Sequence, residues 1–150
     1  MSTREEKTIE AFGDEWSRFN QHHLSNREFN IIYDSYFSIL PDGCISTEAI
    51  LADVGAGSGR FADINASKCK ELIAFEPSKA ATVCKNRLDS HDNAYVLQST
   101  IQDIPKSFEK MFDLVYSLGV LHHTDSIRVS LEKLSTLVKP GGHILLYIYY

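Results

Sequence analysis

A glycine-rich segment that directly follows a short apolar run constrains this chain more than any other feature. The run 49–54 reads Ala-Ile-Leu-Ala-Asp-Val, which is typical of a buried parallel strand. Gly55, Gly57 and Gly59 follow it at alternate positions. Glycine lets the backbone turn tightly and approach a ligand closely, and amides at the start of a following helix are free to donate hydrogen bonds. The segment therefore predicts a strand, a ligand-binding turn and a helix, in that order.

Strands and helices alternate through the rest of the chain. Further apolar runs predict strands over 71–75, 94–97, 112–116 and 143–150. Helical spacing of apolar residues predicts helices over about 58–66, after Pro77-Ser78, and over 127–138, the last of them ended by the turn 139–142. Strands that alternate with helices favour a parallel sheet covered on both faces, with right-handed crossovers. We therefore expect an α/β fold, a Rossmann-like doubly wound parallel sheet of about five strands with N-terminal helices.

Two apolar stripes with helical spacing precede the first strand. The first consists of Ile9, Phe12, Trp16 and Phe19, and the second of Phe29, Ile32, Tyr33, Tyr36, Phe37 and Leu40, ended by Pro41-Asp42-Gly43. Core packing is the simpler interpretation of both stripes, and a lid over a ligand is the alternative. We expect residues 1–45 to form a helical segment that packs on or covers the site, and residues 46–150 to form the binding domain.

Size and composition limit the classes of protein to consider. A chain of 150 residues with 43% hydrophobic content buries one substantial core, so we expect a single domain. The net charge of -5 gives no overall positive field, which argues against a nucleic acid partner. Cys44, Cys69 and Cys84 form no C-x-x-C pair, which fits a reduced cytoplasmic chain. We expect no secretory signal and no membrane span, because no run is apolar for long enough.

The spacing of the glycines distinguishes between kinds of nucleotide site. A dinucleotide-binding loop reads G-x-G-x-x-G, and its third glycine would fall on Arg60. No G-K-[ST] follows the glycines, so the loop is not a P-loop. An NAD-dependent oxidoreductase is therefore the weaker alternative.

Several segments resemble one known family. Residues 53–61 resemble motif I of the class I S-adenosylmethionine-dependent methyltransferases, in which glycines follow an acidic residue two, four and six positions later. Residues 112–123 resemble the fourth strand and following loop of members that act on small molecules and on lipid or quinone precursors. Residues 139–147 are similar to the family's turn into strand five. The resemblance implies S-adenosylmethionine as cofactor and methyl transfer to a small-molecule acceptor as the reaction.

The expected cofactor site combines this resemblance with one further spacing. Glu76 ends the second predicted strand, where an acidic side chain accepts hydrogen bonds from the two hydroxyls of a ribose, as it would also for NAD. Where the family often reads adenine with an acidic residue, this chain has Thr100 or Ile101, with Asp103 a little beyond, so either backbone groups or Asp103 read the base. The expected cofactor-binding residues are Asp53, Gly55, Ala56, Gly57, Gly59, Glu76, Pro77, Thr100, Ile101, Ser117, Leu118 and Gly119.

Methyl transfer from a sulfonium is an in-line displacement that mainly requires alignment of the nucleophile. A hydroxyl acceptor would gain from a general base, and His122 and His123 are the candidates because histidine titrates near neutrality and their loop is expected to face the methyl group. Packing or capping is the alternative role for these adjacent histidines. No metal is expected, since no third ligand lies nearby and the reaction needs none.

The chain stops close to the predicted fifth strand, whereas the resembled family usually adds two more strands. We expect that the sequence is part of a longer protein or that another chain completes the sheet, and the open edge of strand five also favours association between copies. A cofactor-binding module without activity of its own is therefore the main alternative to an enzyme.

Overall fold

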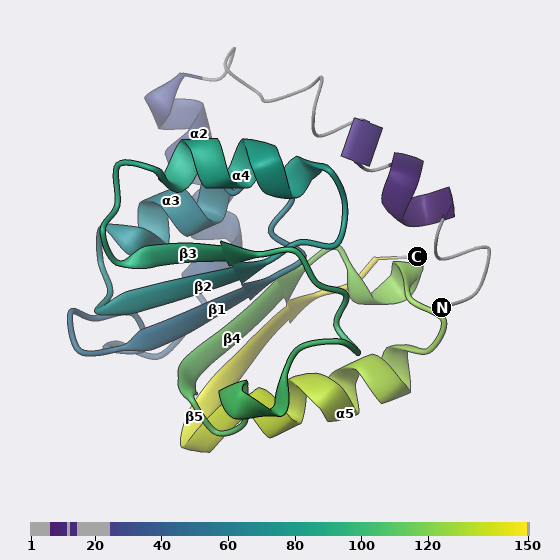
Figure 1. Cartoon of the computed structure of the whole chain (residues 1–150). Coiled ribbons are helices and arrows are strands. Elements are labelled where there is room, and N and C mark those ends of the chain that lie inside the picture. Colours follow the sequence, from purple (N-terminus) through teal and green to yellow (C-terminus); the bar gives the residue numbers. More distant parts are fainter. Residues whose placement is uncertain (1–6, 12, 15–24, 150) are drawn as a thin grey trace.

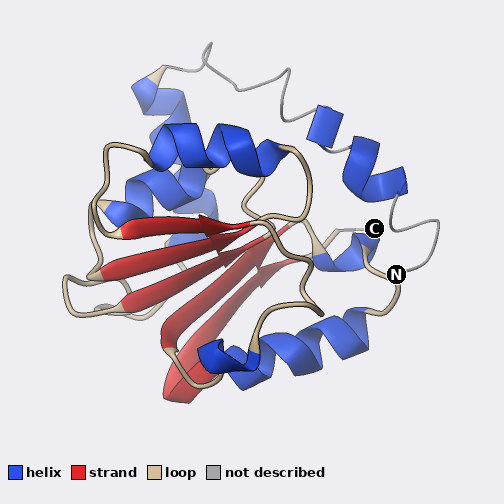
Figure 2. Cartoon of the chain, in the orientation of Figure 1, coloured by secondary structure: helices blue, strands red, loops and turns tan. Residues whose placement is uncertain are grey.

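A five-stranded sheet lies at the centre of the computed structural model, which describes residues 7–11, 13–14 and 25–149 (Figures 1 and 2). The strand order is β3-β2-β1-β4-β5, and every neighbouring pair is parallel. The strands are β1 (Ile50–Val54), β2 (Glu71–Phe75), β3 (Ala94–Leu97), β4 (Phe112–Leu118) and β5 (Val138–Tyr147). The predicted doubly wound α/β fold is therefore confirmed.

Helices cover both faces of the sheet (Figure 1). One face carries α2 (Asn26–Phe37), α3 (Arg60–Ala66) and α4 (Ala80–Leu88), and the other carries α5 (Ile127–Leu137) and the short 3-10 helix η1 (Lys106–Phe108). Each face has its own apolar core: Leu51 of β1 packs with the first group of helices, and its neighbours Ala52 and Val54 pack on the opposite face with α5. This alternation along one strand is why the buried run of β1 is apolar at nearly every position.

The structure describes the second of the two predicted N-terminal helices in full, and the first only in part. Helix α2 begins with a capping box in which Ser25 and Glu28 satisfy each other's backbone amides, as the preference for serine at this position explains. It ends at Phe37, three residues before the predicted end at Leu40. In the first stripe, residues 7–11 and 13–14 are helical, and Phe12, Trp16 and Phe19 lie outside the described residues.

The sequence 139–142, predicted to be a turn before the last strand, lies inside β5, so this prediction was wrong. Strand β5 begins at Val138, which pairs with Phe112, and the register shifts before His143 pairs with Leu114. At the shift, a Cβ on Gly142 would lie 2.8 Å from the carbonyl oxygen of Asp113. The Pro-Gly-Gly sequence thus lies in an irregular part of an edge strand, where the step from Val138 to His143 on β5 faces the shorter step from Phe112 to Leu114 on β4, and an edge strand tolerates both residue types.

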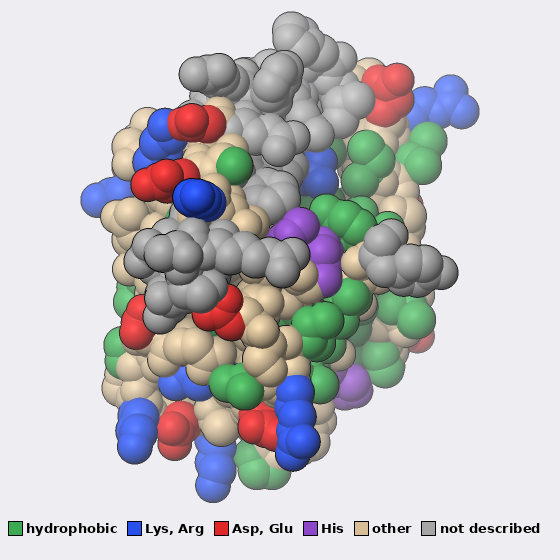
Figure 3. Space-filling model, turned by 90° about the vertical axis from the view of Figure 1, so that its right-hand side faces the viewer, with side chains coloured by type: hydrophobic (Ala, Val, Ile, Leu, Met, Phe, Trp, Pro, Cys, Tyr) green, Lys and Arg blue, Asp and Glu red, His purple; other side chains and the backbone are tan. Residues whose placement is uncertain are grey.

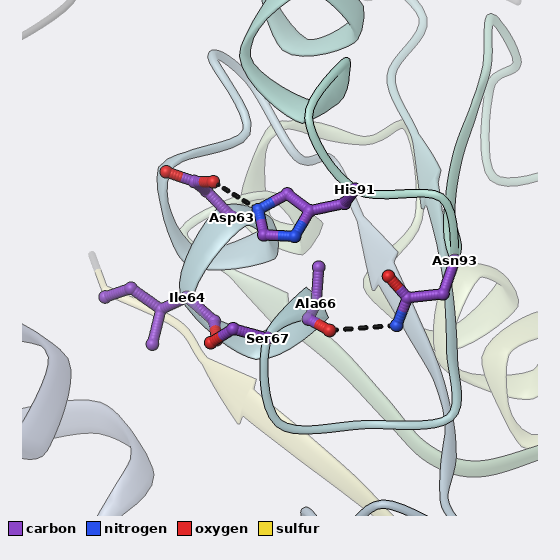
Figure 4. A network of polar contacts seen from close by, with 6 residues as sticks. All are labelled: Asp63, Ile64, Ala66, Ser67, His91 and Asn93. Atoms are coloured by element: carbon purple, nitrogen blue, oxygen red, sulfur yellow. Dashed lines mark hydrogen bonds and ion pairs between the residues drawn. The ribbon is translucent and has the colours of Figure 1, made fainter.

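A polar network fixes the far end of α3 (Figure 4). His91 Nε2 lies 2.7 Å from Asp63 Oδ1, and Asn93 Nδ2 donates to the carbonyl oxygens of Ala66 at 2.9 Å and Cys69 at 3.0 Å. The Asn93 side chain therefore satisfies a carbonyl that the end of the helix leaves without an intrahelical partner. The network thus ties α3 to the segment between α4 and β3.

Two of the three cysteines belong to the apolar core. Cys69 and Cys84 are buried, all three cysteines are free thiols, and burial raises the pKa of Cys69 to about 11. A raised pKa keeps a thiol protonated and unreactive. Within the part of the chain that the structure describes, no helix has both the length and the apolar character needed to cross a membrane.

Candidate functional site

A cavity of about 270 Å³ lies at the carboxyl end of the sheet, where β1 separates β2 from β4. Ligands of doubly wound folds bind at this point, because the chain crosses to opposite sides of the sheet there. Figure 3 views this end of the molecule, where histidine side chains lie beside hydrophobic ones. The wall comes from the end of β1 and the glycine loop (53–58), the start of α3 (60–61), the residues after β2 (76–77), the segment 99–101, the end of β4 with the following loop (118–120 and 123–124), and Thr8, Ile9, Tyr36, Tyr147 and Tyr149.

The glycine loop has a backbone that only glycine adopts readily. Gly55, Gly57 and Gly59 have φ angles of 81°, 56° and 76°. A Cβ on Gly55 would lie 2.4 Å from Val120 Cγ2, and one on Gly59 would lie 2.6 Å from Cys84 Sγ. Two of the three glycines are therefore required by contacts within the protein. Gly55, Ala56 and Gly57 line the cavity, whereas Gly59 caps the start of α3 and does not line it.

Glu76 lies on the cavity wall with both carboxylate oxygens already hydrogen-bonded. Oε2 accepts from the Gly57 amide at 2.8 Å, and Oε1 accepts from the Ser78 amide at 3.0 Å and from Ser78 Oγ at 2.6 Å. A carboxylate offers about four acceptor positions, so roughly one is left. The bidentate recognition of a diol expected from the sequence would therefore need one of these three bonds to be released. The same bonds hold the carboxylate in a single orientation beside the glycine loop.

Asp53 is the penultimate residue of β1 and is only 5% exposed, although it lines the cavity. Burial raises the pKa of this carboxyl to about 7, the negative charge of Glu76 raises it as well, and Tyr116 and Arg60 oppose the change. A carboxylate that is expensive to ionise favours a cationic ligand, because an added positive charge offsets the lost hydration.

The end of the cavity near β3 is lined by Pro77, Ser99, Thr100 and Ile101. Asp103 is not part of this wall: its carboxylate accepts a hydrogen bond from Thr100 Oγ1 at 2.6 Å and lines a neighbouring depression. The two sequence-based alternatives for reading a base therefore differ in position, and only Thr100 and Ile101 face the cavity.

The predicted residues at the end of β4 and in the following loop also differ in whether they reach the cavity. Leu118 and Gly119 line the cavity, with Gly119 at a φ of 75°. Ser117 is fully buried and donates from Oγ to the Val54 carbonyl at 2.7 Å, which ties β4 to β1. Ser117 therefore supports the wall from behind.

The two histidines lie on the 3-10 helix η2 (Leu121–His123) and have different surroundings. His123 lines the cavity, and its Nε2 lies 3.4 Å from Tyr149 Oη. Burial lowers the pKa of His123, and His122 lowers it further. The His122 ring packs between His123 and Tyr149, and among the described residues neither of its buried nitrogens has a hydrogen-bond partner. Only His123 is thus placed to exchange a proton with a ligand.

Sequence reasoning missed the aromatic side of the cavity. Tyr36 and Tyr147 pack edge to face at 5.0 Å between centroids, and Tyr149 lies 5.9 Å from Tyr147. The remaining lining residues that were not predicted are Thr8, Ile9, Val54, Ser58, Arg60, Phe61, Ser99, Val120 and Thr124. The apolar stripe of α2 gave the only sequence signal for Tyr36, and its period does not tell which residue reaches a cavity.

Comparison with known proteins gives a consistent picture. The family model described as "Methyltransferase domain" matches residues 52–146. The tRNA U34 carboxymethyltransferase of Ruthia magnifica is 30% identical over 104 residues, which cover 66% of this chain and 32% of that protein. The ubiquinone biosynthesis O-methyltransferase of Alkalilimnicola ehrlichii is 31% identical over 97 residues, which cover 63% of this chain and 39% of that protein. The chain thus spans about a third of the length of the first relative and about two fifths of the second.

Solved structures share the fold. Phosphoethanolamine N-methyltransferase 1 of Haemonchus contortus, in complex with phosphoethanolamine and S-adenosylhomocysteine, superposes with a TM-score of 0.75 at 18% identity and covers 97% of this chain and 33% of its own. The N-methyltransferase NodS of Bradyrhizobium japonicum, in complex with S-adenosylhomocysteine, gives a TM-score of 0.72 at 17% identity over 91% of this chain and 70% of its own.

Proposed function

Because this chain belongs to the class I S-adenosylmethionine-dependent methyltransferases, we propose that it transfers the methyl group of S-adenosylmethionine to a small-molecule acceptor by direct in-line displacement. The observation that carries the proposal is the cavity between β1, β2 and β4, which places a glycine loop and two acidic side chains, Asp53 and Glu76, around one space. S-adenosylmethionine is the cofactor of the family.

The wall residues fit the parts of this cofactor. Glu76 offers a fixed carboxylate for a ribose hydroxyl, and Pro77, Thr100 and Ile101 form a largely apolar slot for a base beside it. The positive charges of the cofactor offset the cost of ionising Asp53. In this proposal Gly55, Ala56, Gly57, Leu118 and Gly119 contact the cofactor directly. Gly59 and Ser117 hold that wall in position, and the N-terminal segment covers it, as the lining by Thr8 and Ile9 supports.

When bound, S-adenosylmethionine supplies a methyl group activated by a positive sulfur, with S-adenosylhomocysteine as the product. The chain aligns the acceptor and excludes water, and alignment of this kind contributes up to about 7 to 11 kcal/mol in the best intramolecular models. For a hydroxyl acceptor, His123 Nε2 takes the proton, and its lowered pKa keeps the ring neutral and ready to accept it. His122, whose ring nitrogens are buried, packs behind His123.

Charge supports a small acceptor over a nucleic acid. The chain has 15 Lys and Arg against 20 Asp and Glu, so its net charge provides no overall positive field that would attract phosphates. Relatives are named both for a tRNA substrate and for ubiquinone biosynthesis, so the comparisons leave both acceptor classes to experiment.

The test is a transfer assay with radiolabelled S-adenosylmethionine, offered phenols, amines, carboxylic acids and tRNA in separate reactions. The proposal predicts label in a small molecule. Label in tRNA would contradict the acceptor class, and binding of S-adenosylhomocysteine without transfer to any acceptor would instead support a module without activity of its own. NAD should not shift the unfolding temperature, because Arg60 occupies the position of the third glycine in a dinucleotide site.

A matched pair of variants links the activity to the cavity. Gly57→Val places a branched side chain on the wall at a φ of 56°. Gly43→Val imposes the same kind of backbone strain at a φ of 85°, with no atom within 4 Å of the added Cβ. Only the Gly57 variant should lose S-adenosylhomocysteine binding.

A further inference from the structure

Arg60 stands on the wall of the cavity directly after the last glycine of the loop. It is the first residue of α3, and its guanidinium carbon lies 4.4 Å from the centroid of the Phe61 ring. A guanidinium over an aromatic face is attracted by the ring and is held with little loss of hydrogen-bonding capacity. The side chain is therefore kept at the cavity.

Both sequence neighbours of Arg60 are tightly packed. The Phe61 ring is 8% exposed and packs against Phe29 at 6.1 Å and against Tyr36 at 5.6 Å between centroids. On the backbone side, Gly59 packs so closely on α4 that an added Cβ would meet Cys84 Sγ at 2.6 Å. Arg60 is thus attached to two rigid parts of the fold and needs little ordering when it binds a ligand.

The charges around the cavity are complementary to an amino acid. Among the described residues of the wall, Arg60 is the one Lys or Arg, whereas Asp53 and Glu76 supply negative charge. S-adenosylmethionine carries a sulfonium, an ammonium and a carboxylate, so the two acids suit its positive groups and its hydroxyls. The carboxylate needs a cationic donor, and a guanidinium binds it through two parallel hydrogen bonds.

The surroundings of Arg60 favour an anion. Desolvation lowers the pKa of Arg60, and Tyr36 and Asp53 oppose that change. A partly desolvated guanidinium has already lost much of its water, so an incoming carboxylate replaces little hydration and interacts in a less polar medium than bulk water.

From these observations we infer that Arg60 recognises the carboxylate at the amino-acid end of the cofactor. The inference rests on the proposed function, because it assumes that S-adenosylmethionine occupies the cavity. The charged wall residues then recognise different groups of the cofactor: Arg60 binds the carboxylate, and Asp53 favours positive charge. A nucleoside without an amino-acid tail therefore binds poorly.

Calorimetric titration with two ligands tests this assignment without any turnover. One ligand is S-adenosylhomocysteine, and the other is its decarboxylated analogue, which keeps adenosine, thioether and ammonium. For the unmodified chain, loss of the carboxylate should weaken binding by about 10- to 100-fold, the range expected for hydrogen bonds to a charged group. Arg60→Gln should weaken S-adenosylhomocysteine by a similar factor and leave the analogue within about 2-fold. Arg60→Lys keeps the charge without the planar fork and should recover part of the loss.

Arg87→Gln is the matched control. Arg87 lies on α4, close enough for its positive charge to lower the pKa of Arg60, but it does not line the cavity. It should bind both ligands as the unmodified chain does. If Arg60→Gln lost the same affinity for both ligands, the inference would be overturned. It would also be overturned if Arg60→Gln bound S-adenosylhomocysteine as tightly as the unmodified chain does, even if the variant had a higher KM for an acceptor that carries a carboxylate. If Arg60→Gln does not fold, Arg60→Lys must still lose more affinity for S-adenosylhomocysteine than for the analogue. An unmodified chain that binds neither ligand would refute the proposed function itself.

Discussion

Replacing Gly59 by alanine should lower the free energy of unfolding by about 2 to 5 kcal/mol, through two effects at one position. The residue has a φ of 76°, and a side chain in this left-handed region costs about 1 to 2 kcal/mol. The new Cβ would also lie 2.6 Å from Cys84 Sγ and 3.3 Å from Cys84 Cα, and overpacking of a buried contact costs about 1 to 3 kcal/mol. This is a large part of the roughly 5 to 15 kcal/mol that stabilises an ordinary domain.

Two further variants separate the effects. Gly43 has a φ of 85° and no atom within 4 Å of an added Cβ, so Gly43→Ala should cost only the backbone share, about 1 to 2 kcal/mol. Cys84→Ala removes the nearest clashing atom. In that background Gly59→Ala should cost only slightly more than Gly43→Ala, because the Cα at position 84 still lies 3.3 Å from the added Cβ, and most of the about 1 to 3 kcal/mol of overpacking should appear as coupling between positions 59 and 84.

Urea denaturation followed by circular dichroism measures all four variants, with the slope of each transition checked for a constant value. Equal losses for Gly59→Ala and Gly43→Ala, or the same cost of Gly59→Ala with and without Cys84, would refute the reasoning. The loop glycine would then be needed for its backbone angle alone, and the close packing of α3 on α4 would not constrain the site.

Three other predictions concern charged and titrating groups of the cavity. Because burial raises the pKa of Asp53 from 3.8 to about 7, the folded state binds more protons than the unfolded state between these pH values, and the free energy of unfolding falls as pH rises through that window. The whole change amounts to a free energy on the order of 4 kcal/mol. Asp53→Asn should flatten this pH dependence in urea titrations at pH 4 to 8. Glu76→Gln should weaken binding of S-adenosylhomocysteine about 10- to 100-fold in calorimetry, while Glu109→Gln, at an exposed position, should leave this affinity unchanged. Equal affinities of the two variants for the ligand would remove Glu76 from the site. With a hydroxyl acceptor, His123→Gln should slow transfer by about 100- to 10,000-fold without changing cofactor affinity. Because the pKa of His123 is lowered, the rate of transfer by the unmodified chain should decline only as pH falls below 6.5, the usual pKa of histidine. A His122→Gln variant that is slowed as much would contradict the assignment.

The sequence predicted the parts of the site that depend on local order along the chain. A buried strand followed by glycines located the loop after β1, and the spacing to Glu76 located the end of β2, because parallel strands deliver their carboxyl ends to the same edge of a sheet. It did not predict which way neighbouring side chains point. Ser117 and Leu118 are adjacent, but one bonds to Val54 behind the wall and the other faces the cavity.

Contacts between distant segments account for the rest. The start of β5 at Val138 depends on its pairing with Phe112, which the Pro-Gly-Gly sequence does not reveal. In the sequence, Arg60 indicated only that the third glycine of a dinucleotide loop is absent. That the Phe61 ring beneath its guanidinium packs against Tyr36 of α2 is a contact between distant segments. His122 and His123 are equivalent in sequence, and only the fold buries the nitrogens of the first.

A crystal structure of the chain grown with S-adenosylhomocysteine tests the central claim most directly. The account predicts the ligand in the cavity between β1, β2 and β4, with a ribose hydroxyl within about 3.2 Å of a Glu76 carboxylate oxygen and the amino-acid end against residues 55–60. A ligand bound elsewhere, or a cavity that the protein's own side chains fill at saturating ligand, would contradict it.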